Sequence, residues 1–454
     1  MGLEYSSVID APREELFAWH TRPGAFTRLS PPWQPTRIIA ECGSVADGRA
    51  VLGLPGGLRW VADHEPQGYH PPARFTDHVS YDGRLDALPA KTFVRWRHIH
   101  DFEEVSETQT RMVDRVIGNV PAFALRSMFA YRHRQLAADI AAHQRAAAAG
   151  LPSTTVAITG ASGLIGSALA AFLSTGGHRV IRLTRTPATS PDERQWNPAD
   201  PHPDLLAGVD AVIHLAGASI AGRFTEEHRR AVWDSRVGPT RRLAELVAQT
   251  PGGPPTVVCA SGIGYYGYDR GEESLTEDSD RGDGFLADLV AEWEAAAAPA
   301  AQAGARVVNL RIGSAQSPRG GALARLRPLG MAGLGGRIGD GRQWMAWIGI
   351  DDLVDVFHRA LWDTDLSGPV NAVAPNPVRN ADYSRALART LRRPALLPTP
   401  DLAVRLALGE QGVREMAHAS LRVTPAKLQS AGHRFRHPRI EQALAHVLGR
   451  TPTP

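Results

Sequence analysis

Three glycines, Gly160, Gly163 and Gly166, form a G-x-x-G-x-x-G motif of the kind that binds a diphosphate. The motif directly follows the apolar run TVAIT and precedes the helical text LIGSALAAFLST. Glycine suits these positions because the chain must turn sharply, approach a pyrophosphate closely and pack a helix against a strand. The N-terminus of that helix adds free N–H groups and a partial positive charge. The strand, loop and helix together favour a dinucleotide site over a purely structural turn.

The end of the next strand bears on which dinucleotide would bind. The run RVIRLTR ends with Leu183, Thr184 and Arg185, and no carboxylate follows until Asp192. A carboxylate at this place accepts hydrogen bonds from the ribose of NAD, whereas an arginine suits the 2′-phosphate of NADP. We therefore predict NADP (NADPH) as the cofactor. The alternative is that Arg185 is only a solvated strand end.

Candidate catalytic hydroxyls follow a later apolar strand, at Ser261, Tyr265 and Tyr266. A tyrosine with an ordinary pKa near 10 is a poor base at neutral pH and needs a cation close by. An oxidised nicotinamide, Arg311 or Arg342 could supply that charge. Catalytic and pocket-lining roles of the two tyrosines both remain open.

The elements that must position these residues are apolar strands alternating with helices. Such alternation predicts an α/β fold with a Rossmann-type, doubly wound parallel sheet. A break in composition at AAAAGLPSTT marks a domain boundary. We predict an α+β domain over residues 1–148, a linker over 149–153, the cofactor-binding domain over 154–375, and a small substrate-side region over 376–454.

The N-terminal region reads as short strands followed by a long amphipathic helix after Pro121. Such a sheet and helix usually leave a cavity between them, which could hold a hydrophobic ligand. His98 and His100 share one face of the strand FVRWRHIHDF, and imidazoles at i and i+2 can converge on a metal. Because no carboxylate or third ligand is apparent at a fixed offset, we predict cavity lining and no metal site.

Composition excludes some classes of partner. The 454 residues are 43% hydrophobic, and the formal charge of +3 is too small for a nucleic-acid footprint. The only cysteines, Cys42 and Cys259, lack metal-ligand spacing and indicate a reduced compartment. No secretory signal is visible, and the longest uncharged stretch, 153–177, is broken by glycine, serine and threonine. We expect a cytoplasmic protein that binds neither nucleic acid nor membrane.

Several motifs together resemble a known family. They are TGASGLIG, HLAG, CASG, GYYG, DGFLADLVAEWE, GDGRQWMAWIGIDDL and LRVTPAKLQSAGHRFRHP. Over residues 154–450 they are similar to the epimerase-like, atypical branch of the extended short-chain dehydrogenase/reductase superfamily, whose members carry a C-terminal domain of unknown function. The N-terminal region resembles, through fainter motifs, the START-like (SRPBCC, polyketide cyclase-like) domains fused to some members of this branch.

The resemblance implies a cofactor site assembled from several loops. The residues expected to contact the cofactor are Gly160, Ala161, Ser162, Gly163, Leu164, Ile165, Gly166, Thr184, Arg185, Leu215, Ala216, Gly217, Ala218 and Arg311. It also implies Ser261 as the group that polarises a carbonyl.

The family's Tyr-x-x-x-Lys pair is absent, because the only lysines are Lys91 and Lys427. Leu289 or Val290 stands at the lysine place, on a helix expected to pack and not to react. We expect an NADP(H)-dependent oxidoreductase that acts on a small or hydrophobic carbonyl or alcohol. The alternatives are a nucleotide-sugar epimerase or dehydratase, and a non-catalytic NADPH-sensing or scaffold protein.

Overall fold

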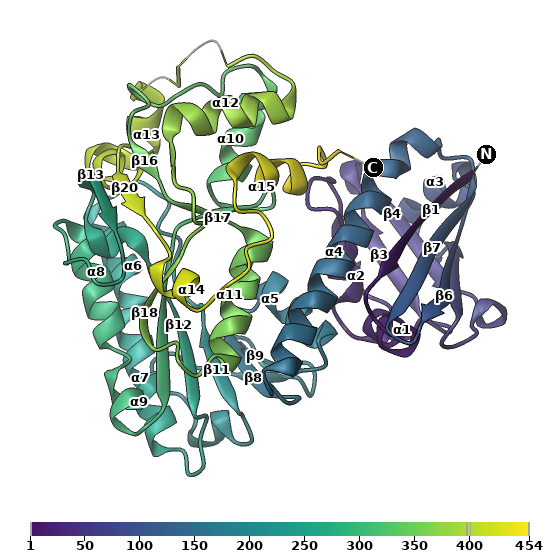
Figure 1. Ribbon diagram of the computed structural model, residues 1–454, viewed down its shortest axis with the longest axis horizontal. Helices are drawn as coiled ribbons and strands as arrows, with labels where there is room; N and C mark the ends of the chain where they lie inside the picture. The colour runs from purple at the N-terminus through teal and green to yellow at the C-terminus, as the bar shows by residue number, and fades with distance from the viewer. Residues whose placement is uncertain (1, 396–397, 400, 453–454) are drawn as a thin grey trace. The chain divides into compact units, whose positions relative to one another are not determined.

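The computed structural model describes residues 2–395, 398–399 and 401–452, which divide into two compact units. The first unit contains the residues up to Ala148, with Ala171–Gly177 and the residues from Gly449 onward. The second contains Ala149–Ala170 and His178–Leu448. Figure 1 labels the elements of both units.

The first unit is built on a seven-stranded antiparallel sheet in the order β1-β7-β6-β5-β4-β3-β2. Its strands are β1 (Gly2–Ile9), β2 (Arg37–Ala40), β3 (Arg49–Gly53), β4 (Arg59–His64), β5 (Arg74–Val79), β6 (Trp96–Ser106) and β7 (Gln109–Gly118). Three short helices, α1 (Arg13–Thr21), α2 (Ala25–Leu29) and α3 (Leu88–Phe93), lie between the strands in sequence.

A long helix, α4 (Ala122–Ala148), completes this unit after β7. Its buried residues include Leu125, Phe129, Leu136 and Ile140, the helical spacing read from the sequence. They join core clusters built from strand and helix side chains such as Phe102. The region is therefore an antiparallel sheet with a long helix, and its resemblance to START-like domains stays a prediction.

The second unit contains a seven-stranded sheet in the order β10-β9-β8-β11-β12-β14-β18, and every neighbouring pair is parallel. The strands are β8 (Thr155–Thr159), β9 (Arg179–Thr184), β10 (Glu193–Gln195), β11 (Ala211–His214), β12 (Thr256–Gly262), β14 (Arg306–Ile312) and β18 (Gly368–Ala372). The predicted Rossmann-type parallel sheet is thus confirmed. The strand order reverses between β8 and β11, where ligands bind in such sheets.

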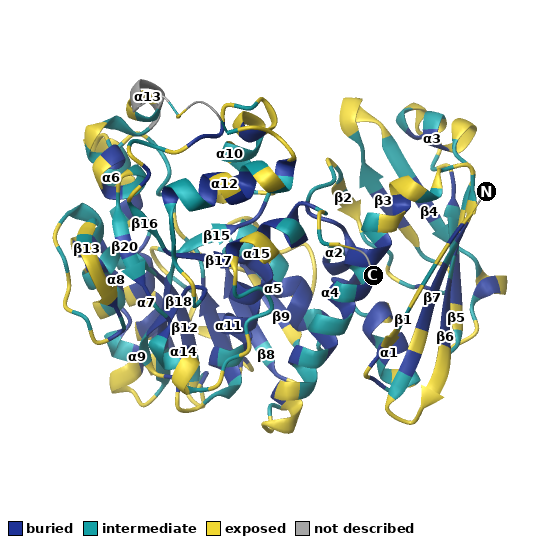
Figure 2. Cartoon of the chain, turned by 45° about the horizontal axis from the view of Figure 1, so that its top comes forward, coloured by how far each residue is buried: buried dark blue, intermediate teal, exposed yellow. Residues whose placement is uncertain are grey.

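This sheet is buried on both faces, as a parallel sheet must be. Val156, Ala157 and Ile158 are consecutive residues of β8, and none of them is exposed. Figure 2 shows β12 and β18 as mostly buried. One face packs against α7 (Val237–Gln249) and α9 (Ala298–Gln302), through residues that include Ile181, Val212, Val257, Leu243, Val247 and Ala300.

The remaining helices of the second unit lie between the strands and toward the C-terminus. They are α5 (Leu164–Thr175), α6 (Glu226–Asp234), α8 (Phe285–Ala295), α10 (Gly321–Met331), α11 (Ile350–Trp362), α12 (Asn380–Leu391), α13 (Asp401–Gly412), α14 (Ala426–Ser430) and α15 (Ile440–Val447).

Among its described residues, this unit also contains three two-stranded sheets. They pair β13 (Asp269–Leu275) with β20 (Ser420–Val423), β15 (Ser314–Gln316) with β17 (Trp347–Gly349), and β16 (Trp344–Met345) with β19 (Val378–Arg379). Two of them, β13–β20 and β16–β19, pair a strand of the C-terminal region with a strand from the rest of the unit. Helices α12 and α15 share a core cluster with Trp347.

Two further structural findings concern membranes and thiols. Among the described residues, no helix combines the length and the apolarity needed to cross a bilayer. Cys42 and Cys259 are both free thiols.

Candidate functional site

The glycine-rich loop lies between β8 and α5, where the chain must pack too closely for side chains. Gly160 has a φ of +67°, a conformation that L side chains rarely adopt. A Cβ atom on Gly166 would lie 2.2 Å from the carbonyl oxygen of Gly160 and 2.8 Å from Ala161 Cα. Ser162 and Gly163, at the turn itself, are exposed. The loop therefore presents open backbone at the N-terminus of a twelve-residue helix.

A hydrogen-bond network fixes this loop to the loop that follows β11. Thr159 Oγ1 accepts hydrogen bonds from the backbone N–H groups of Leu215 (3.0 Å) and Ala216 (3.1 Å), and lies 2.8 Å from His214 Nδ1. Burial, reinforced by the charge of Arg236, lowers the pKa of His214 to about 4. A neutral His214 can accept a hydrogen bond from the Thr159 hydroxyl at Nδ1, so this contact requires no charge on the ring.

Arg236 holds the loop that follows β11 through contacts with its backbone. Its Nη2 donates to the carbonyl oxygen of Ala218 at 2.9 Å, and a Cβ atom on Gly217 would lie 2.9 Å from its Cζ. Burial lowers the pKa of this arginine to about 10. The segment Leu215–Ala218 is thus held in place beside the glycine-rich loop, consistent with its predicted role.

The chain just after β9 is exposed to solvent. Thr184 Oγ1 donates to the carbonyl oxygen of Thr186 at 2.8 Å, whereas Arg185 is exposed. Within the described part of the chain, no hydrogen bond or ion pair engages the Arg185 guanidinium. Its charge is therefore free to meet an anion at the strand end.

The candidate catalytic residues lie at the carboxyl edge of the sheet, where register aligns them. Ser261 on β12 pairs with Arg311 on β14, which pairs with Asn371 on β18. Glu294, near the end of α8, connects this row: Ser261 Oγ donates to its Oε1 at 2.6 Å.

Arg311 makes a two-pronged ion pair with Glu294. Its Nε lies 2.9 Å from Oε1 and its Nη2 lies 2.8 Å from Oε2. Although burial opposes the charge, Glu294 holds the pKa of Arg311 above its usual value. Arg311 was predicted to contact the cofactor, but its guanidinium is engaged by Glu294 and, through Nη1 at 3.1 Å, by the Tyr266 hydroxyl.

The two adjacent tyrosines have different surroundings. Tyr266 is fully buried, donates to Asn371 Oδ1 at 2.7 Å, and has a pKa raised by burial to about 12. Tyr265 is half-buried, and Arg311 Cζ lies 3.5 Å from its ring centroid. Its hydroxyl makes no hydrogen bond to the described residues. These surroundings favour Tyr265 over Tyr266 for proton transfer.

Helix α8 packs as expected, but it also carries a residue that the sequence reasoning missed. Leu289, Val290 and Trp293 are buried, so the position of the family lysine is apolar. Glu294 was not singled out, yet its carboxylate connects Ser261 to Arg311. The available signal was the position of Glu294, which directly follows the buried Trp293 on this helix.

In the first unit, the structure brings a carboxylate to the two predicted histidines. Asp77, His98 and His100 line a cavity of about 310 Å³, as the predicted cavity-lining role requires. The carboxylate was missed because Asp77 is 21 residues before His98 in sequence, and only strand pairing makes them neighbours. Although burial opposes ionisation, His100 and His98 hold the pKa of Asp77 well below its usual value.

Sequence comparisons match the second unit to one family. Residues 156–372 match the NAD dependent epimerase/dehydratase family, and residues 399–447 match a domain of unknown function (DUF1731). An epimerase family protein of Mycobacterium tuberculosis is 42% identical over 66% of this chain and 99% of its own length. The epimerase family protein YfhF of Bacillus subtilis is 32% identical over 64% of this chain and 97% of its own length.

Two solved structures are similar at the level of sequence and fold. The nucleoside-diphosphate sugar epimerase from Corynebacterium glutamicum is 44% identical, covers 98% of this chain and 90% of its own, and superposes with a TM-score of 0.86. The human epimerase family protein SDR39U1 (isoform 2), solved with NADPH, is 30% identical over 65% of this chain and all of its own, with a TM-score of 0.60. By these matches the chain belongs to the epimerase family, in the atypical branch of the short-chain dehydrogenases/reductases that includes SDR39U1.

Proposed function

We propose that this protein binds NADP(H) and is an oxidoreductase that acts on a small or hydrophobic carbonyl or alcohol substrate. The observation that carries the proposal is the glycine cradle between β8 and α5. A side chain at Gly166 would overlap the backbone of Gly160, while the exposed turn at Ser162 and Gly163 leaves N–H groups available to a diphosphate.

The choice of the phosphorylated cofactor rests on Arg185. Its exposed guanidinium, at the end of the second strand of the fold, is suited to a 2′-phosphate. The human relative SDR39U1, solved with NADPH, supports the same choice.

In the proposed reaction, a nicotinamide coenzyme held by the glycine-rich loop would supply the hydride chemistry, and this chain's side chains would move the proton. The Ser261 hydroxyl donates a hydrogen bond to Glu294, and the Tyr266 hydroxyl donates a hydrogen bond to Asn371. Tyr265 is the hydroxyl left for a substrate, with Arg311 as the neighbouring cation that proton transfer from tyrosine requires. Ser261, Glu294 and Arg311 therefore position Tyr265.

Titration calorimetry with NADPH and NADH tests cofactor binding. Gly166→Ala is expected to weaken NADPH binding at least about 100-fold, because the loop cannot keep its approach to the diphosphate. Gly43→Ala is the matched control, since a Cβ atom there meets nothing within 4 Å. No heat of binding with either coenzyme, or equal affinity in Gly166→Ala and wild type, would overturn the proposal.

NADPH oxidation against a panel of carbonyl compounds tests the chemistry. We expect Tyr265→Phe to lower kcat at least about 100-fold and Tyr266→Phe to change it only a few-fold, since proton transfer contributes this much. Unchanged turnover in both variants would remove both tyrosines from the mechanism.

A second candidate function is epimerisation of a nucleotide sugar, favoured by the description of the Corynebacterium glutamicum structure. Its signature is conversion of a nucleotide sugar without net release of oxidised or reduced coenzyme. A third candidate function is NADPH sensing without turnover. It is favoured because apolar residues, Leu289 and Val290, stand where the family has its lysine. A tightly bound, reduced coenzyme that no carbonyl of the panel oxidises would support it.

The partners proposed are a small-molecule substrate and, in the first unit, a hydrophobic ligand in the cavity, with neither nucleic acid nor a membrane. We place the protein in the cytoplasm because its two cysteines, Cys42 and Cys259, are both free thiols.

A further inference from the structure

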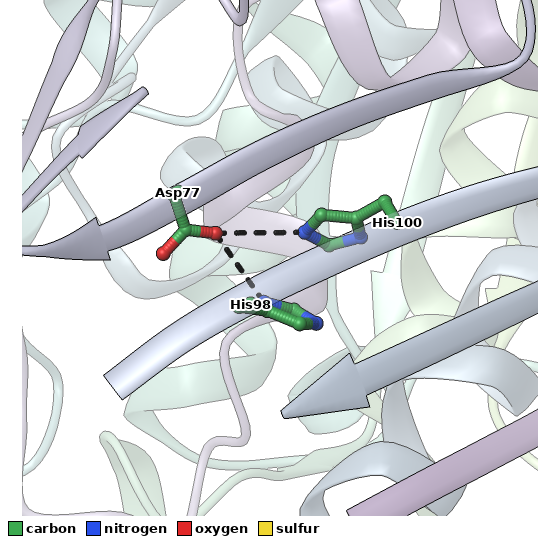
Figure 3. Close-up of side chains that lie close together, drawn as sticks. All are labelled: Asp77, His98 and His100. Atoms are coloured by element: carbon green, nitrogen blue, oxygen red, sulfur yellow. Dashed lines mark ion pairs between the residues drawn. The ribbon is translucent and has the colours of Figure 1, made fainter. Parts of the chain in front are cut away.

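The cavity of the first unit has an apolar wall and one polar end. Its volume is about 310 Å³, and Trp60, Phe75, Leu125 and Phe129 are among the apolar side chains around it. The polar end is formed by Asp77, His98 and His100, whose side chains are 13%, 5% and 4% exposed. Figure 3 shows the three side chains converging from neighbouring strands. Other polar side chains, among them His20, His64 and Arg132, also line the cavity.

Strand register produces this convergence. Asp77 on β5 pairs directly with His98 on β6, and His100 lies two residues further along the same face. Directly paired residues place their Cβ atoms about 5 Å apart, close enough for a carboxylate to reach both imidazoles. The three side chains are thus held by the sheet itself.

The distances between the facing atoms suit a small cation. Asp77 Oδ2 lies 3.3 Å from His98 Nδ1 and 3.7 Å from His100 Nε2. One ligand atom from each of the three residues falls within 4.8 Å of the others. Tetrahedral ligands about 2.0–2.1 Å from a zinc ion are about 3.3–3.4 Å apart. The group therefore needs only small shifts to enclose such an ion.

A second carboxylate lies behind the two imidazoles. Asp114, whose side chain is fully buried, contacts His98 Nε2 at 3.0 Å. His100 Nδ1 lies 2.8 Å from the same oxygen, although its N–H direction is poor for a hydrogen bond. These are the ring nitrogens opposite those that face Asp77. A carboxylate on the far nitrogen of a metal-binding histidine fixes the ring and makes it a better ligand.

The outer carboxylate is itself held in place. Its other oxygen, Oδ2, lies 2.9 Å from His133 Nε2, and His133 Nδ1 lies 2.7 Å from Ser7 Oγ. A divalent cation between Asp77 and the two inner imidazoles would balance the two buried carboxylates while those imidazoles stay neutral. Buried charges require this kind of compensation.

We propose that Asp77, His98 and His100 bind a divalent transition-metal cation of the zinc class at the polar end of this cavity, with Asp114 as a positioning residue. Three protein ligands leave a coordination position for a polar group of a molecule in the cavity, as in catalytic zinc sites. This site is separate from the proposed cofactor site, and its test does not depend on NADP(H) binding.

The test uses full-length protein treated with a chelator and then titrated with Zn²⁺ by calorimetry. We expect one saturable site per chain. His98→Gln, His100→Gln and Asp77→Asn should each weaken Zn²⁺ binding at least about 100-fold, because each removes a direct ligand. His78→Gln is the matched control: it follows Asp77 on β5, its side chain is 40% exposed, and it contacts Glu65. We expect it to stay within about threefold of wild type.

Asp114→Asn distinguishes the positioning residue from the three direct ligands. It should weaken Zn²⁺ binding about 10- to 100-fold while the stoichiometry stays at one ion per chain. Circular dichroism in chelator verifies that each variant is folded.

Visible absorption of the Co²⁺-loaded wild type provides a readout that needs no variant. The intense ligand-field bands of a four-coordinate site support the proposal. Wild type without a saturable site, a Co²⁺ spectrum equal to that of the free ion, or ligand variants that bind like His78→Gln would overturn it.

Discussion

Each of the two units buries a cluster of charged side chains, and the two clusters are balanced in different ways. In the second unit, Arg311 and Glu294 form a two-pronged pair whose charges cancel. In the first unit, Asp77 and Asp114 face imidazoles. The net charge of this cluster depends on protonation or on a bound cation. An arginine keeps its charge at all relevant pH values, whereas a histidine can lose its proton and become a ligand.

The two clusters also differ in what their polar groups face. The residues at the expected catalytic position form a closed network, in which the polar groups bond to other protein atoms, whereas the cluster of the first unit is open to a cavity. Ser261 and Tyr266 both direct their hydroxyls at protein atoms. Asp77 and His98 instead line a cavity. The closed network suits a role in positioning, and the open cluster suits a role in binding.

The largest effect is expected from breaking the closed pair. Arg311→Met should lower the free energy of unfolding by about 3 kcal/mol, because it leaves the largely buried carboxylate of Glu294 without a cation and with only the hydrogen bond from Ser261. Urea unfolding followed by fluorescence measures this loss. The double variant Arg311→Met/Glu294→Leu should recover more than half of it, and a single-variant loss under about 1 kcal/mol would show that the pair is not closed.

A second prediction concerns the neutral histidine behind the glycine-rich loop. The pKa of His214 is about 4 in the folded protein and about 6.5 when unfolded, so the unfolded state takes up its proton first as the pH falls. The stability advantage of wild type over His214→Gln should be full above pH 6.5 and decline by up to about 3 kcal/mol as the pH falls to 4. Urea unfolding at a series of pH values measures it, and an advantage that grows on acidification would show the opposite sign.

The open cluster should tolerate charge removal better than the closed one. Asp114→Asn, in chelator, is expected to cost about 2 kcal/mol of unfolding free energy, because asparagine keeps the shape of the side chain and an oxygen that can accept hydrogen bonds from the imidazoles around it. The same urea assay compares it with Arg311→Met. A cost equal to or above that of Arg311→Met would remove the distinction between the two clusters.

The smallest effect on stability is expected at the exposed arginine. Arg185→Glu should leave the free energy of unfolding within about 0.5 kcal/mol of wild type, as surface changes usually do. It should weaken NADPH binding about 10-fold or more while NADH binding is retained. Arg182→Glu, also exposed and on β9, the strand that ends just before Arg185, is the control. Equal losses of affinity for NADPH and NADH would show that Arg185 does not recognise the 2′-phosphate.

Much of the second unit could be predicted because its signals are local. The strands β8, β9, β11, β12 and β14 all appear in the sequence as short apolar runs, and the glycine motif lies within seven residues. A buried parallel strand needs apolar residues on both faces, and a tight turn needs glycine, whatever surrounds them.

The contacts of the candidate sites could not be predicted in this way. Glu294 reaches Ser261 across 33 residues of sequence, and Asp77 reaches His98 only through the register of β5 and β6. Such contacts depend on how elements pair and pack, and a one-residue change of register would point each side chain to the other face.

The sequence by itself determined the parallel sheet, the glycine cradle at Gly160–Gly166 and the absence of a lysine from helix α8, because each is set by residue type and local spacing. Only the tertiary structure shows that Tyr265 and Tyr266 have different surroundings. The two residues are chemically identical and adjacent, but packing buries the second against Asn371 and leaves the first half-buried under Arg311.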